Sequence, residues 1–294
     1  MGTLYLVATP IGNLQDLSPR AAETLRRAHV VAAEDTRHTR KLLSAASIPA
    51  PRLVSYYEPD EQEQAQTLAT ELDAGRNVAL VTDAGTPGIS DPGYRIVCLA
   101  IEKGHRVVPI PGPNAALALL SVSGLPTDRF LFAGFPPQKG GPRKKFFEDL
   151  ALERATVLLH ESPVRLGETL KEMAEVFGPA RRVVIGRELT KIHEEIYRGS
   201  LEEMARRFAK ESVVGEVAIA LEGDREKRIE PSAEILEAEI KEALEVRGLS
   251  VRDVSDQLAK KYGVPRKRIY RMALGQGGPS GASKDSPEDE PPTP

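Results

Sequence analysis

Residues 80–96, LVTDAGTPGISDPGYRI, join an apolar run to a segment, 83–93, that holds three glycines and two prolines. Glycine lets a ligand approach the backbone closely, whereas proline fixes φ and stops the segment from continuing as a helix. In open α/β sheets, ligands bind beyond the carboxyl ends of the strands. We therefore expect a stiff, open loop at a strand end, with exposed backbone donors facing a ligand.

Two known phosphate and nucleotide loops do not fit this segment. A P-loop needs the GxxxxGK[ST] pattern, and no lysine follows these glycines. A dinucleotide-binding GxGxxG motif would follow the first strand, but TPIGNL (9–14), which occupies that place, has a single glycine. An ordinary rigid turn remains an alternative, because glycine and proline clusters often only punctuate a fold.

Apolar runs rich in β-branched residues alternate with helix-like segments through most of the chain, which predicts βα units around mostly parallel sheets. The expected strands are 4–9, 30–35, 52–57, 77–83 and 106–112, then 129–135, 156–162, 181–189 and 215–223. The break near PGPNAAL (111–117) divides them into two α/β domains in series, residues 1–113 and 114–224.

The end of the chain differs in composition from the two α/β domains. Residues 224–231 are a charged linker, and 232–275 are expected to form a small basic helical module that resembles a helix-turn-helix. Its segment 247–274 carries eight basic residues against two acidic ones, and Val254, Leu258 and Ile269 are expected to pack its two helices together. The last residues, 276–294, are rich in Gly, Ser, Pro and acid, and we expect them to be disordered.

Composition excludes several classes of protein. No apolar run approaches the ~18 residues of a membrane helix, and the start of the chain lacks the basic region of a secretory signal. The single cysteine, Cys98, excludes a disulfide framework and a cysteine-based zinc site. We expect a soluble cytoplasmic protein.

Four motifs follow the first, second, fourth and fifth expected strands: TPIGNL (9–14), EDTRHTRKLL (34–43), DAGTPGISDPG (83–93) and PGPNAAL (111–117). If the sheet is parallel, all four lie on one edge. With ESPVRL (161–166) and RELTKIHEE (187–195), they resemble the bacterial ribosomal RNA small subunit methyltransferase I family of the tetrapyrrole methylase superfamily. The resemblance covers residues 2 to 223.

This resemblance implies two αβα domains of tetrapyrrole-methylase type, S-adenosyl-L-methionine in the cleft between them, and a homodimer. It also implies 2'-O-methylation of the ribose of a cytidine in the decoding region of 16S rRNA, with the rRNA or the small ribosomal subunit as partner. The implied reaction requires no metal. The implied cofactor-binding residues are Pro10, Asp83, Gly85, Pro87, Gly88, Ile89, Asn114, Ala115, Glu161 and Ser162, with 217–221 closing over the adenine. Asn114 could equally be a helix N-cap, and Asp83 a turn-forming residue.

Removing the proton from a 2'-hydroxyl requires a base or a cation close to it. Two strand-end clusters could supply one, and the candidates are Glu34, Asp35, Arg37, His38 and Lys191. The carboxylates or His38 could accept the proton, Arg37 could hold a phosphate, and Lys191 could lower the pKa of the hydroxyl. Each of them could instead form ion pairs or cap the following helix.

Contacts with RNA are expected from basic residues at the periphery. The candidates are Lys139, Arg143, Lys144 and Lys145 on a glycine-rich loop, and Lys260, Lys261, Arg266, Lys267, Arg268 and Arg271 in the terminal module. Phe146 and Phe147 beside that loop are expected to be core residues rather than stacking platforms. Two alternatives remain: a methylase of the same fold that acts on a small tetrapyrrole-like substrate, and a non-catalytic nucleic-acid-binding regulator.

Overall fold

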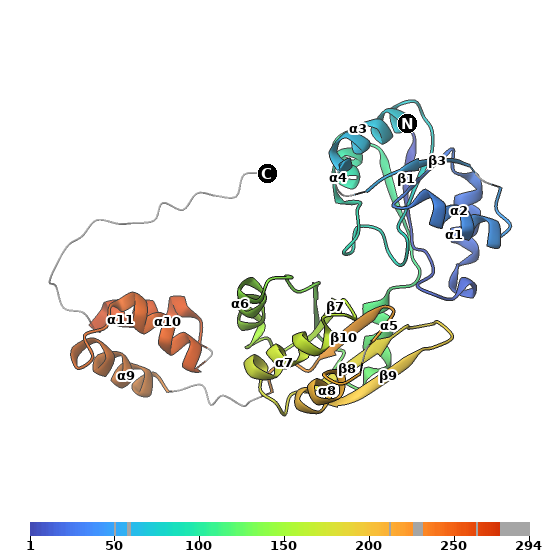
Figure 1. The fold of residues 1–294 in the computed structure, drawn as a ribbon. Coiled ribbons are helices and arrows are strands. Elements are labelled where there is room, and N and C mark those ends of the chain that lie inside the picture. Colours follow the sequence, from blue (N-terminus) through green and yellow to red (C-terminus); the bar gives the residue numbers. More distant parts are fainter. Residues whose placement is uncertain (50, 58–59, 212, 226–231, 263, 277–294) are drawn as a thin grey trace. The chain divides into compact units, whose positions relative to one another are not determined.

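The structure is a computed structural model that describes residues 1–49, 51–57, 60–211, 213–225, 232–262 and 264–276 (Figure 1). It divides into two compact units, Met1–Asp224 and Arg225–Pro294, which are described separately. Most of the expected linker, Gly263 in the expected turn, and the tail beyond residue 276 lie outside the described residues.

The first sheet is fully parallel, as the sequence predicts, with strand order β3-β2-β4-β1-β5. Its strands are β1 (Thr3–Val7), β2 (Val30–Ala33), β3 (Arg52–Ser55), β4 (Val78–Val81) and β5 (Arg106–Ile110). Its helices are the short 3-10 turn η1 (Leu14–Asp16), α1 (Pro19–Arg27), α2 (Thr36–Ala45), α3 (Glu61–Asp73) and α4 (Tyr94–Glu102). Because the strands are parallel, the loops after β1, β2, β4 and β5 share one edge of the sheet.

Successive side chains of each strand point to opposite faces of the sheet, and helices pack on both faces, which gives a three-layer domain. On one face, Val31 and Ala33 of β2 pack in a core that contains Leu25 of α1 and Leu43 of α2. On the other face, Ala32 belongs to a core shared with α3 and α4. Both faces of the buried sheet are therefore covered by helices, as expected for parallel strands.

The second sheet is mixed and mainly antiparallel, which corrects the expectation of mostly parallel sheets, and its order is β6-β7-β10-β8-β9 (Figure 1). Its strands are β6 (Phe130–Gly134), β7 (Thr156–Glu161), β8 (Arg182–Arg187), β9 (Glu195–Ser200) and β10 (Val217–Leu221), and only β6 and β7 pair in parallel. The hairpin strand β9 was not expected from sequence. Its residues, EIYRGS, are all exposed or half-buried, so it lacks the apolar run that marks the other strands.

Helices cover both faces of the second sheet. They are α5 (Ala115–Ser123) on one face and α6 (Gly140–Leu150), α7 (Leu166–Phe177) and α8 (Leu201–Phe208) on the other. The core under α5 also contains Ile11 and Ala84, which come from the loops after β1 and β4. Apolar packing therefore joins the first sheet's strand-end loops to the second sheet.

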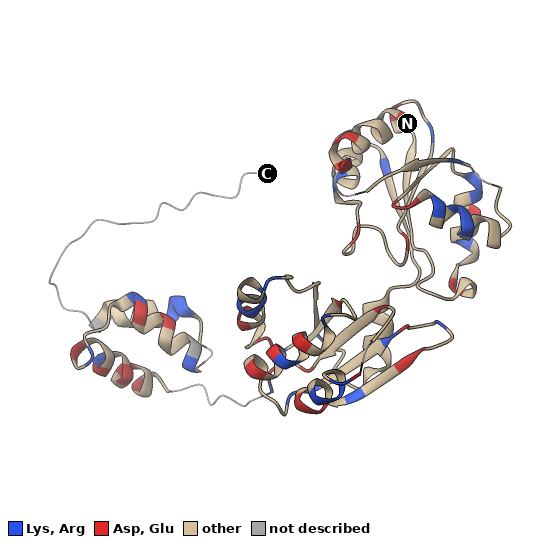
Figure 2. Cartoon of the chain, viewed as in Figure 1, with Lys and Arg blue, Asp and Glu red and all other residues tan. Residues whose placement is uncertain are grey.

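The C-terminal unit is a three-helix cluster of α9 (Ala233–Glu245), α10 (Val251–Tyr262) and α11 (Arg266–Gln276). Val254, Leu258 and Ile269 are buried together, which confirms the expected packing of the last two helices. The charges are unevenly distributed (Figure 2): acidic residues predominate on α9, and basic residues outnumber acidic ones on α10 and α11. The net positive charge of 247–274 therefore describes α10 and α11 and not the whole cluster.

Candidate active site

Three strand-end loops of the first sheet are tied together. Thr9, after β1, and Gly85, after β4, exchange backbone hydrogen bonds of 2.8 and 3.1 Å. The hydroxyl of Thr86 donates to the carbonyl of Pro113, after β5, at 3.2 Å. Gly85 has a φ of +90°, which only glycine adopts without strain, so the loop needs glycine at this position.

A pocket of about 370 Å³ lies against these loops, a volume within the usual range for small-molecule sites. The predicted residues that line it are Glu34, Asp83, Gly85, Ile89, Asn114, Ala115, Glu161 and Ser162, with Val217 and Ala218 of β10. The predicted residues that do not line it are Pro10, Pro87, Gly88, Asp35, Arg37, His38 and Lys191. Lining residues that the sequence reasoning missed include Ile11, Asp91, Phe135, His160 and Glu216.

Three carboxylates form an acidic wall of this pocket. The backbone N–H of Asp83 donates to Glu34 Oε2 at 3.3 Å, and Asp83 Oδ1 accepts from the backbone N–H of Asp35 at 3.1 Å. The third carboxylate, Asp91, is partly buried. Burial and the negative charges of Glu34 and Asp83 raise the pKa of Asp91 to about 7. The wall therefore combines a site for positive charge with one carboxyl group that titrates near neutrality.

Asp35 and Arg37 interact with each other outside the pocket. Asp35 is the N-cap of α2, and it accepts from the backbone N–H of Arg37 at 2.7 Å and from its guanidinium at 2.8 Å. These hydrogen bonds hold the pKa of Asp35 well below its usual range, so it is a poor proton acceptor at neutral pH. Arg37 is 84% exposed, and His38 is also exposed on α2.

Two predicted cofactor residues have structural roles at the pocket wall. Asn114 is the N-cap of α5 and accepts from the backbone N–H of Leu117 at 3.1 Å. The buried carboxylate of Glu161 accepts from Ser162 N–H, Thr169 Oγ1 and Arg165 Nη2, each at 2.6 Å. Both residues therefore shape the pocket by fixing the backbone around it.

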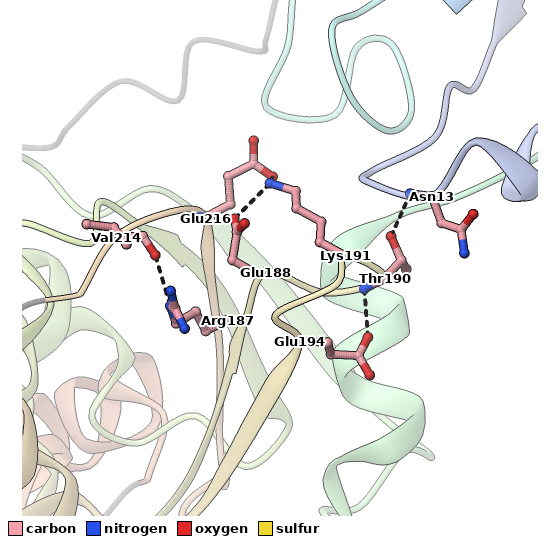
Figure 3. A network of polar contacts seen from close by, with 8 residues as sticks. All are labelled: Asn13, Arg187, Glu188, Thr190, Lys191, Glu194, Val214 and Glu216. Atoms are coloured by element: carbon pink, nitrogen blue, oxygen red, sulfur yellow. Dashed lines mark hydrogen bonds and ion pairs between the residues drawn. The ribbon is translucent and has the colours of Figure 1, made fainter. Parts of the chain in front are cut away.

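Lys191 belongs to a polar network at the turn after β8 (Figure 3). Its ammonium lies 2.8 Å from Glu188 Oε1 and 3.1 Å from Glu216 Oε2. Burial lowers the pKa of Lys191, but these two carboxylates outweigh it and raise the pKa above its ordinary value. Lys191 is therefore a permanent cation next to Glu216, which lines the pocket.

The same network connects the two sheets. The backbone N–H of Asn13, after β1, donates to Thr190 Oγ1 at 3.1 Å (Figure 3). Gly12 lies so close to the turn that a β-carbon there would come within 2.3 Å of the Lys191 side chain. Glu188 and Thr190 both have positive φ, at +51° and +67°. Such conformations are strained for side-chain-bearing residues and often mark functional sites.

The segment around residue 143 corrects two expectations. Residues 140–150 form helix α6 rather than a glycine-rich loop. Arg143 has a side chain only 1% exposed, 2.7 Å from Glu172 and 3.1 Å from Glu168, so the prediction that it contacts RNA is wrong. Phe147 is fully buried and Phe146 packs beside it, which confirms that both belong to the core.

The remaining basic candidates differ in their surroundings. Lys139, Lys144 and Lys145 are exposed at the start of α6. In the C-terminal unit, Lys261 pairs with Glu239 at 2.6 Å and Arg266 pairs with Asp256. Lys267, Arg268 and Arg271 are exposed on α11, and the side chain of Lys260 lies outside the described residues.

Within the described residues, no group of three or more His, Cys, Asp or Glu side chains has an arrangement that could hold a metal ion. None of the helices formed by those residues is long and apolar enough to cross a bilayer.

The pair of sheets, with a pocket built from the strand-end loops of the first and the strands of the second, defines a two-domain α/β protein of the methylase class. The family model described as Tetrapyrrole (Corrin/Porphyrin) Methylases matches residues 3–205. Solved structures of this fold include a cobalt precorrin-4 methyltransferase (TM-score 0.58, 19% identity, covering 75% of this chain and 94% of that one). A diphthine synthase is similar (TM-score 0.57, 18% identity, covering 75% and 90%).

Curated relatives show a much higher identity over nearly the whole chain. A ribosomal RNA small subunit methyltransferase I of Synechocystis sp. is 44% identical over 275 residues, 93% of this chain and 98% of the relative. The protein of that name from Mesorhizobium japonicum is 45% identical over 272 residues, 92% of this chain and 91% of the relative. The chain belongs to the ribosomal RNA small subunit methyltransferase I family of the tetrapyrrole methylases, as the motifs predicted.

Proposed function

We propose that the protein transfers a methyl group from S-adenosyl-L-methionine to the ribose 2'-hydroxyl of a cytidine in the decoding region of 16S rRNA. The relatives' names support rRNA of the small subunit as the substrate. The acidic pocket formed by both sheets is the observation that carries the proposed chemistry. The solved structures below 25% identity support the fold alone and do not favour a tetrapyrrole substrate.

The pocket fits the proposed cofactor. S-adenosyl-L-methionine is a sulfonium cation with an ammonium group, and when bound it supplies an activated methyl group. The carboxylates of Glu34, Asp83 and Asp91 favour such positive charge. The backbone at Gly85 allows close approach, and Val217 and Ala218 provide a buried apolar wall for the adenine.

Asp91 is the proposed acceptor of the 2'-hydroxyl proton. A general base is most effective when its pKa lies near the working pH, and the pKa of Asp91 is about 7. Glu34 lines the same pocket and is the second candidate. Much of the rate enhancement would come from alignment of the acceptor, an effect worth up to about 7–11 kcal/mol in well-oriented systems.

We propose that exposed cations of both units bind the phosphates of the RNA. Lys139, Lys144 and Lys145 near α6 and Lys267, Arg268 and Arg271 on α11 are the proposed phosphate contacts. Arg37 and Lys191 are proposed to contact phosphates nearer the pocket. Such contacts give affinity that falls with salt and carries little sequence information.

We also propose a homodimer. On α4, Tyr94, Cys98 and Ile101 are exposed at helical spacing and form an apolar stripe. Burying this stripe against a second copy would remove apolar surface from water. Light scattering on the purified protein tests the dimer, and replacing Tyr94 and Ile101 with glutamate should shift the mass to that of a monomer.

The function is tested with S-adenosyl-L-methionine labelled in its methyl group. We expect label in 16S rRNA, presented free or within small subunits, and recovery of that label as 2'-O-methylcytidine after digestion to nucleosides. A methylated 2'-oxygen also blocks alkaline cleavage at that nucleotide, which locates the position in the rRNA. Label recovered on a base, or only on a porphyrin or corrin precursor, would refute the proposal.

A further inference from the structure

One exposed aromatic ring lies at the pocket. Phe135, immediately after β6, is 54% exposed and lines the pocket. The pairing of β6 with β7 is irregular between Phe132 and Gly134, and Gly134 has a φ of +69°. A β-bulge of this kind re-aims the following side chain and is common next to active sites. The bulge therefore accounts for an apolar ring directed to the pocket instead of into a core.

A second ring supports Phe135. His160 of β7 also lines the pocket, and its ring centroid is 5.3 Å from that of Phe135 and 5.3 Å from that of Phe132. Burial lowers the pKa of His160, opposed by the negative charge of Glu216. The imidazole is therefore neutral at physiological pH, and the two rings form an uncharged aromatic surface.

This surface adjoins the acidic wall. A β-carbon on Gly134 would lie 3.4 Å from Ser90 Oγ, so the bulge packs against the loop that carries Asp91. The buried apolar part of the pocket, by contrast, includes Gly186, Leu189, Val217 and Ala218. An adenine needs that enclosed apolar part, whereas Phe135 remains open to solvent and accessible to a second molecule.

The chain beyond Phe135 leads to proposed RNA contacts. Lys139 follows four residues later, and Lys144 and Lys145 are exposed on α6. Stacking surfaces beside basic side chains are the usual means of binding unpaired nucleotides. Phe147 is buried and Phe146 packs against the same core, so neither ring provides that surface.

We propose that Phe135, supported by His160, stacks against the base of the nucleotide whose ribose is methylated. This inference rests on the proposed function and adds a recognition site for the unpaired pyrimidine. Phe135 and Asp91 line the same pocket, so a base stacked on the ring would be held in the pocket that contains the proposed proton acceptor. Proteins typically recognise unpaired RNA bases by stacking them on aromatic side chains.

The test compares Phe135→Ala, Phe135→Tyr and a matched control, Phe130→Ala. Phe130 is the first residue of β6 and is 46% exposed, but it does not line the pocket. For Phe135→Ala we expect kcat/KM for the RNA to fall roughly 5- to 150-fold, the range for loss of one stacked base. Phe135→Tyr and Phe130→Ala should stay near the wild type. Affinity for S-adenosyl-L-methionine, measured by calorimetry, should be unchanged in all three.

A second test removes the other stacking partner, by using an RNA with an abasic ribose at the target position. Together with Phe135→Ala it forms a double-mutant cycle. The wild type should lose activity on this RNA, and Phe135→Ala should lose little more, because the stacking partner is already absent. Additive losses, or a weaker cofactor affinity in Phe135→Ala, would overturn the base site while leaving 2'-O-methylation by the wild type in place. Failure of the wild type to label any RNA would overturn the proposed function and this inference together.

Discussion

Asp91 makes a stability prediction that can be worked out from its surroundings. Its carboxyl group has a pKa of about 7 in the folded chain, against an ordinary value of 3.8. At 1.36 kcal/mol per pKa unit, the difference corresponds to about 4 kcal/mol. Asp91 is partly exposed, so solvent screening reduces the effect, and we expect about 1–3 kcal/mol.

The sign follows from linkage. Because the folded pKa is raised, the stabilising contribution of protonated Asp91 is complete below pH 3.8 and is lost as the pH rises towards 7. Asp91→Asn replaces the carboxyl group with a neutral group of the same shape. The variant should therefore be more stable than the wild type, by an amount that grows between pH 4.5 and 7 and is constant above it.

Urea unfolding of both proteins without cofactor, at several pH values from 4.5 to 8.5, measures this difference. Asp128→Asn, at an exposed aspartate outside the acidic wall, is the control and should show no such trend. A difference independent of pH, or a variant less stable than the wild type at pH 8, would refute the reasoning. If Asp91 also accepts the proton in catalysis, the variant should lose methyl transfer while gaining stability.

The other predictions concern cofactor binding, RNA binding and stability. Asp83→Ala should abolish or strongly weaken binding of S-adenosyl-L-methionine while the protein remains folded, and unchanged affinity by calorimetry would exclude its proposed role. Removing residues 225–294, a separate compact unit, should leave cofactor affinity intact and weaken rRNA binding, and full-rate methylation across a salt series would contradict this. Arg143→Ala should lower the free energy of unfolding by about 1–3 kcal/mol with little effect on RNA affinity, because its pairing is internal. Replacing Lys144 and Lys145 with alanine should weaken RNA binding with little effect on the free energy of unfolding. Filter binding measures the first quantity and denaturation the second.

The sequence alone predicted the number of sheets and most of their strands. Buried strands such as β4 and β10 are continuous apolar runs, so local sequence is enough to recognise them. The loop after β4 could also be recognised from local sequence, because its backbone conformation requires glycine. Strand β9 was not predicted because none of its residues is buried, so its sequence lacks the pattern of apolar residues that marks a strand.

Site membership depended on the fold. EDTRHTRKLL offers four candidate residues within five positions, yet only Glu34 lines the pocket. Asp35 is instead the N-cap of α2, and its carboxylate binds Arg37. Asp91 and Phe135 were overlooked because their importance comes from distant neighbours: Glu34 and Asp83 around the first, and a bulge and His160 beside the second.

Local sequence therefore determined most of the secondary structure, the strand-end loops and the family, since each depends on residues close together in the chain. Only the tertiary structure decided which charged side chains face the pocket and which form internal ion pairs, as Arg143 does with Glu172. The physical reason is that burial and charge pairing depend on contacts between segments far apart in sequence, and these contacts exist only once the sheets have formed and packed.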